Sequence, residues 1–86
     1  MNFNIDVLKK KISYRSTYRG TKEMDLLLSS FVKDIIDDLN QDELIKLLAF
    51  LKIDDENLYK FNQGIKTNIS VEKNEITNLF KKYKLK

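Results

Sequence analysis

The stretch YRSTYRGTKEMDLLL, residues 14–28, decides how this chain folds, because two different patterns meet inside it. A segment rich in lysine and arginine ends there, and the most apolar run of the sequence begins. Gly20 lies at the junction. Since glycine accepts backbone angles closed to other residues, we predict that Gly20 forms a corner between two helices. Arg19 then lies just before the corner, and Glu23 falls in the first turn of the next helix, where a carboxylate is electrostatically favoured.

The residues on both sides of this corner have the spacing of amphipathic helices. We expect a first helix, capped by Asn4 or Asp6, to end near Ser16. A second helix is expected from about Thr21 to Leu39. Its apolar stripe is broad enough to contact neighbours on more than one side, which predicts the centre of the core. The stripe consists of Met24, Leu27, Leu28, Phe31, Ile35 and Leu39, widened by Leu26, Val32 and Ile36.

Residues that can cap helices occur at intervals along the rest of the chain. Asn40 precedes a third helix, with Glu43 three residues on as its capping-box partner. Asp54 is predicted to cap a short fourth helix over about residues 56–63, and Gly64 stands where a left-handed C-cap is expected.

The last helix is expected to begin after Ser70 and to run to about Tyr83. The sequence has no proline and two glycines, which favours helices over turn-rich β structure. We therefore predict an all-α fold, a compact bundle of about five short helices. The 86 residues correspond to one domain, residues 1–86.

The composition excludes several kinds of chemistry. The sequence has no cysteine and no histidine, so disulfides, thiolate nucleophiles and the commonest general base and metal ligand are missing. It has no Gly-rich phosphate loop. No stretch approaches the length of a membrane span, and the N-terminal residues do not resemble a secretory signal. We predict a cytoplasmic binding module, not an enzyme, with no catalytic residue and no metal site.

Charge is unevenly distributed along the chain. Residues 1–23 carry six basic and two acidic side chains, residues 24–57 carry three and nine, and residues 58–86 carry seven and two. A nucleic-acid binder usually concentrates positive charge on one face, whereas here an acidic middle lies between two basic ends. A basic helical module that binds nucleic acid, or an antitoxin-like protein, therefore remains the alternative. It would depend on the lysines at 9–11 or 81–86.

Three stretches together resemble one known family. The run RGTKEMDLLL, residues 19–28, is similar to the RGxxE(L/M)D signature of the FAD assembly factors of succinate dehydrogenase, the SdhE family, some of whose members are labelled antitoxin CptB. LNQDEL at 39–44 resembles the start of the family's next helix. LLAFL at 47–51, followed by DDENL at 54–58, resembles the stretch after it. The resemblance covers about residues 9–83.

This resemblance implies a fold and a function. Members have a compact five-helix fold and bind the flavoprotein subunit of succinate dehydrogenase, in some cases that of fumarate reductase. They promote covalent attachment of FAD to a histidine of that subunit. The chain itself is then expected to hold no cofactor stably, and no nucleic acid is expected as a partner.

The signature also implies a partner-binding surface. We expect Arg19 to donate a bidentate fork to the partner and Gly20 to let two backbones approach closely. Glu23 would accept a bond from the partner or hold Arg19 in place, and the sequence does not decide between these roles. The partner-binding residues predicted are Arg15, Tyr18, Arg19, Gly20, Glu23 and Asp25.

Overall fold

The computed structural model describes residues 4–85, and within them the chain forms α-helices and no strand. The helices are α1 (Ile5–Ser16), α2 (Lys22–Ile35), α3 (Gln41–Phe50), α4 (Asp55–Gln63) and α5 (Glu75–Lys82), with a 3-10 turn, η1 (Ile36–Asp38), after α2. The prediction of an all-α fold of about five short helices is confirmed for this part of the chain.

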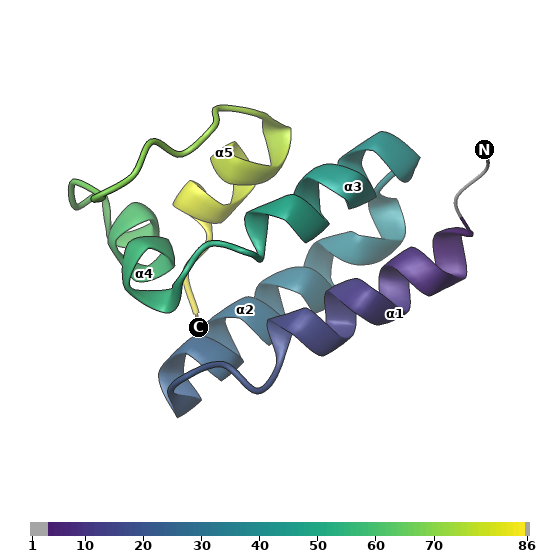
Figure 1. Cartoon of the computed structure of the whole chain (residues 1–86), viewed down its shortest axis with the longest axis horizontal. Helices are drawn as coiled ribbons and strands as arrows, with labels where there is room; N and C mark the ends of the chain where they lie inside the picture. The colour runs from purple at the N-terminus through teal and green to yellow at the C-terminus, as the bar shows by residue number, and fades with distance from the viewer. Residues whose placement is uncertain (1–3, 86) are drawn as a thin grey trace.

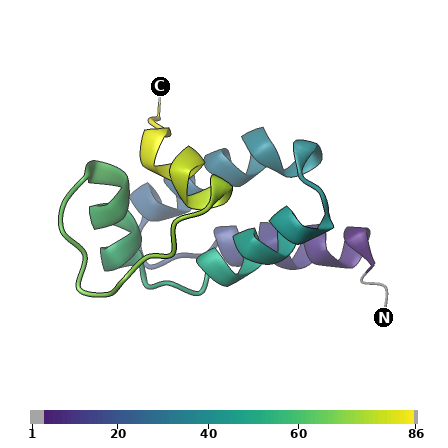
Figure 2. The ribbon, with the colours of Figure 1, turned by 90° about the horizontal axis from the view of Figure 1, so that it is seen from above.

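The helices form an elongated bundle (Figure 1). α1 packs against both α2 and α3, and α5 packs against α3 and α4. Both views place the N-terminal end of α1 at one end of the molecule and α4 at the other (Figures 1 and 2). The corner between α1 and α2 lies at the same end as α4, so this end gathers segments that are distant in sequence.

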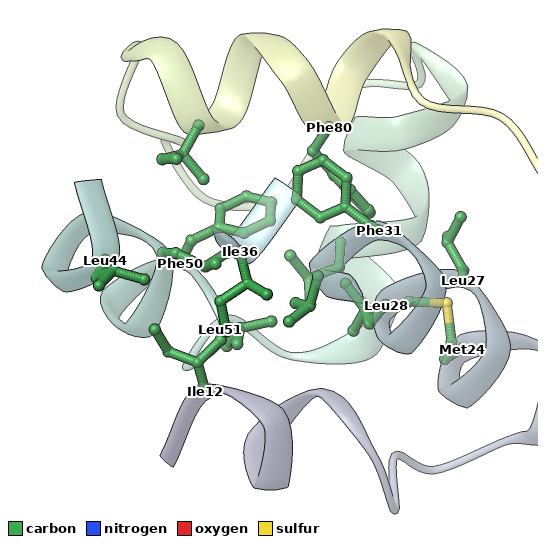
Figure 3. Packing of buried hydrophobic residues seen from close by; sticks show 14 of the residues in the cluster. Ile12, Met24, Leu27, Leu28, Phe31, Ile36, Leu44, Phe50, Leu51 and Phe80 are labelled. Atoms are coloured by element: carbon green, nitrogen blue, oxygen red, sulfur yellow. The ribbon is translucent and has the colours of Figure 1, made fainter. Parts of the chain in front are cut away.

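The core consists of the apolar faces of the helices, joined by aromatic contacts. The Phe31 ring of α2 meets the Phe80 ring of α5 edge to face at 5.0 Å, and Phe50 of α3 meets Phe80 at 5.1 Å (Figure 3). Edge-to-face pairs at this spacing stabilise a fold beyond the area that they bury. The predicted stripe of α2 is buried from Met24 to Val32, except for Leu26, which is 57% exposed.

Most predicted caps are confirmed. The Asn4 side chain accepts from the backbone N–H of Asp6 at 2.9 Å, which makes Asn4 the N-cap of α1. Asn40 and Glu43 form the expected capping box of α3. Gly64 ends α4 in the left-handed conformation, with φ of 74°.

Two predicted helix boundaries are wrong. α2 gives way to the 3-10 turn after Ile35 and does not continue to Leu39, which is extended. The turn carries Asp37 and Asp38, and acidic side chains are unfavourable at the carbonyl end of a helix.

The other wrong boundary is the start of α5. Its N-cap is Asn74, not Ser70. The Asn74 side chain accepts from the Thr77 N–H at 2.9 Å, and the Thr77 hydroxyl accepts from the Asn74 N–H at 3.0 Å. This reciprocal pair satisfies two backbone donors at the start of α5 that have no partner inside the helix.

The corrected boundary makes a prediction. Replacing Asn74→Ala removes the cap of α5 and should lower the free energy of unfolding by about 1 kcal/mol. Ser70→Ala is the matched control and should leave it unchanged, because Ser70 caps nothing. Urea denaturation followed by circular dichroism measures both, and equal losses in the two variants would contradict the assignment of Asn74 as the cap.

Candidate functional site

The corner between α1 and α2 is made by Tyr18, not by the backbone freedom of Gly20. Tyr18 has φ of 56°, in the left-handed region, where a non-glycine residue is uncommon. The space beside Gly20 is tight instead. A Cβ atom there would lie 3.1 Å from Oδ2 of Asp55, so the carboxylate would have to shift to accommodate it. The left-handed residue of the corner is therefore Tyr18, two residues before the predicted Gly20. The glycine instead allows a close approach of Asp55 within the chain.

Arg19 ties three segments together at this corner. Its Nε donates to Oδ1 of Asp55 at 2.7 Å. Nη1 donates to the backbone carbonyls of Arg15 and Leu51 at 3.0 and 2.9 Å, and Nη2 donates to that of Ile53 at 2.9 Å. The side chain is 12% exposed. The guanidinium thus links the end of α1, the connection after α3 and the first residue of α4.

Asp55 completes the network from the other side. Its Oδ2 accepts from the backbone N–H of Gly20 at 2.7 Å, while its Oδ1 faces Arg19. The backbone N–H of Arg19 donates to the carboxylate of Asp25 in α2. Because two carboxylates fix the backbone of residues 19–20, the corner is held rigidly from both α2 and α4.

This geometry changes the role expected for Arg19. All three guanidinium nitrogens already donate within the chain, so Arg19 holds the corner together and offers no fork to solvent. Whether Arg19, Gly20 or Asp25 also touches a partner stays a prediction. Sequence reasoning missed Asp55 as the partner of Arg19. The signal available was its place in the DDENL stretch of the family resemblance.

Glu23 is the acidic residue of the signature that remains exposed. It lies in the first turn of α2. Among residues 4–85 it makes no hydrogen bond through its side chain, and no ion pair includes it. The carboxylate that holds Arg19 is that of Asp55. Glu23 was expected either to accept a bond from the partner or to hold Arg19 in place. Since Asp55 holds Arg19, the Glu23 side chain is left available to a partner.

Two tyrosines stand out on the α1 side of the corner. Tyr14 and Tyr18 are 71% and 85% exposed, with ring centroids 6.1 Å apart and planes tilted by 51°. Together with Arg15 and Asp55 they line an open polar hollow of about 480 Å³. Tyrosine and arginine are enriched in protein interfaces. The predicted residues Tyr18 and Arg15 thus line a different hollow from those that Glu23 lines.

The α4 terminus that carries Asp55 is itself fixed by Asp54. Oδ1 of Asp54 accepts from the side-chain amide of Asn57 at 2.8 Å, and Oδ2 accepts from the Asn57 backbone N–H at 3.2 Å. These bonds favour the charged carboxylate, the side-chain amide most strongly, and so lower the pKa of Asp54 below its ordinary value of 3.8.

Over residues 4–85, no group of three acidic side chains converges to hold a metal ion. In the same part of the chain, no helix has the length and apolar character that crossing a membrane requires. The site is a rigid corner with exposed side chains on both sides, which suits recognition of another molecule.

Comparison with known families bears on this site. A family described as Sdh5, flavinator of succinate dehydrogenase, matches residues 10–84. That range includes the corner, Asp55 and both flanking surfaces. No curated protein and no solved structure gives a significant match.

The close approach of Gly20 and Asp55 predicts coupled substitutions. Gly20→Ala should cost about 1–2 kcal/mol of unfolding free energy, because the new methyl group displaces the Asp55 carboxylate. Asp55→Ala should cost about 2 kcal/mol, since it removes charge-assisted bonds to Arg19 and Gly20. In the Asp55→Ala background, Gly20→Ala should cost almost nothing. A double-mutant cycle by chemical denaturation measures the coupling, and additive losses would contradict the network.

The lowered pKa of Asp54 predicts an acid-sensitive cap. A carboxyl group whose pKa falls on folding contributes stability that is present above about pH 4 and is lost as the pH falls through the folded-state value. Asp54→Asn keeps a capping oxygen that does not titrate. The difference in melting temperature between the unmodified chain and Asp54→Asn should be constant from about pH 7 to pH 5. Below about pH 4 the unmodified chain should lose stability relative to the variant, because only the unmodified chain has a capping carboxylate to protonate. A difference independent of pH down to about 2 would contradict it.

Proposed function

This chain belongs to the Sdh5 family, the flavinators of succinate dehydrogenase, and we propose that it is an assembly factor for the flavoprotein subunit of that enzyme. It binds the subunit and promotes covalent attachment of FAD to it. The observation that supports this most is the exposed Glu23, which has no bonding partner within residues 4–85, beside a corner whose other signature residues are bonded to one another or to Asp55.

The proposed contribution is positional. The chain has no histidine and no cysteine, and it supplies no atom to the bond that forms between FAD and its acceptor histidine in the partner. It binds one conformation of the flavoprotein in preference to others and so shifts the population towards the arrangement in which those two groups meet. Holding reacting groups in attacking geometry accelerates a reaction without any added catalytic group.

The structure supports a division of labour within the signature. Arg19, Gly20 and Asp25 fix the corner through Asp55 and each other. A surface that is rigid before binding loses less conformational entropy when the complex forms. Glu23 and Tyr18, both exposed, are then the proposed contacts on either side of that rigid corner.

Two other predictions from the sequence fit this proposal less directly. The flavoprotein of fumarate reductase is a second proposed target, on the family resemblance alone, and cytoplasmic location remains an expectation.

Nucleic-acid binding, the alternative function considered from the sequence, is disfavoured by the ion pairs. Lys9 pairs with Asp37 at 3.2 Å, and Lys46 pairs with Glu75 at 2.9 Å, so acidic side chains interrupt the basic surface.

Substitution of Glu23 tests the proposed function. Glu23→Gln keeps the shape of the side chain and removes its charge. Losing one charge-assisted bond to the partner should weaken binding about tenfold or more, so co-expression with the flavoprotein subunit should leave much less covalent flavin. Fluorescence of the flavoprotein band on a denaturing gel, divided by its protein stain, measures the effect.

Two controls make the result specific. Glu72→Gln changes another exposed glutamate, far along the chain, and should retain full flavin attachment. The melting temperature of Glu23→Gln should fall by no more than about a few degrees, because its side chain makes no bond within residues 4–85 and the change removes only a favourable charge from the first turn of α2. Full flavin attachment with Glu23→Gln and with the charge reversal Glu23→Lys would refute the docking role.

A further inference from the structure

A band of exposed apolar side chains lies beside Glu23, around hollows that Tyr18 does not line. Tyr59, Ile65 and Leu85 are 47%, 51% and 43% exposed. They belong to α4, to the connection that follows it and to the chain after α5. Contiguous exposed apolar surface is uncommon on a small monomer and marks interaction sites.

Two open hollows show that the band is continuous. One, of about 360 Å³, extends from Glu23, Met24 and Tyr59 to Ile65. The other, of about 320 Å³, extends from the same three residues to Leu85. Met24 is only 5% exposed and forms their common floor. The band therefore presents two adjacent depressions with one carboxylate, that of Glu23, at their shared rim.

The charged side chains around the hollows differ in whether they have a partner among the described residues. Lys60, in the first hollow, pairs with Glu56 at 3.3 Å. Lys84, in the second hollow, donates to the backbone carbonyl of Asn62 at 2.6 Å. Both cations thus have partners inside the chain, whereas Glu23 has none within residues 4–85. What binds here is expected to bring a positive charge for Glu23.

The chain does not supply this group from its described residues. Its N-terminal end lies at the far end of the molecule from α4 (Figures 1 and 2), and Leu85 is already part of the wall of the second hollow. A second copy fits poorly. In a two-fold dimer the same patch faces itself, which would place two Glu23 carboxylates in one contact.

We infer that this band, Met24, Tyr59, Ile65 and Leu85 with Glu23 at its rim, receives a large apolar side chain of the flavoprotein subunit that lies next to an arginine or lysine. The apolar side chain occupies a hollow over Met24, and the neighbouring cation pairs with Glu23. This inference rests on the proposed function and adds to it the chemistry of the segment that is bound. Most of the affinity then comes from the apolar contact, and the Glu23 carboxylate determines which apolar side chain of the partner segment enters the hollow, namely one that lies next to a cation.

The experiment compares apolar residues inside and outside the band. Tyr59→Ser and Ile65→Ser alter it, and Ile69→Ser and Leu79→Ser are controls with 43% and 45% exposure that line neither hollow. All four positions are exposed, so the melting temperatures should change little. Titration calorimetry with the purified flavoprotein subunit should give about tenfold weaker binding for each band variant. The controls should stay within about twofold of the unmodified chain.

The outcomes separate this inference from the proposed function. If Glu23→Gln weakens binding and the band variants bind like the controls, the inference is wrong and the proposed function stands. If the unmodified chain neither binds the subunit nor raises its covalent flavin, both are wrong. If light scattering shows a dimer that Ile65→Ser separates, the band is a contact between copies and the inference is wrong.

Discussion

The ion pair between Arg19 and Asp55 is the interaction on which this structure depends. α4 packs chiefly against α5, and the Arg19 side chain, with its bonds to Asp55 and to the carbonyls of Leu51 and Ile53, is what joins its start to the corner of α1 and α2. The pair is largely shielded from solvent, and its lone pairs and donors are taken up by backbone groups. A buried charge pair contributes favourably under these conditions.

The same pair gives the signature a different meaning from the one that its sequence suggests. A run of arginine, glycine and glutamate within five residues looks like one exposed surface, yet only part of it faces outward. Arg19 and Gly20 are engaged with Asp55, and Glu23 projects from the next helical turn. A bulky residue at Gly20 therefore acts first on the position of Asp55, before any contact with a partner is considered.

Whether the sequence could predict a feature depends on how far apart along the chain the interacting residues lie. The caps at Asn40 and Asp54 were predictable because they are decided within four residues. The start of α5 was not, because Ser70 and Asn74 are both good caps, and the preceding connection is fixed by the bond from Asn68 to Asn57, eleven residues away. Asp55 lies 36 residues from Arg19, and nothing local to either residue signals that pairing.

Several features at this end of the bundle do not help the isolated chain to fold. Tyr18 adopts a left-handed backbone, which costs an L-residue about 1–2 kcal/mol, while its ring is 85% exposed and returns little packing. Glu23 has no partner within the described residues, and Ile65 leaves half of its surface in water. The hollows on both sides of the corner share Asp55 as a wall. Residues that conflict with local stability are expected to mark function, and here they lie around the corner that Asp25 and the Arg19–Asp55 pair hold in place.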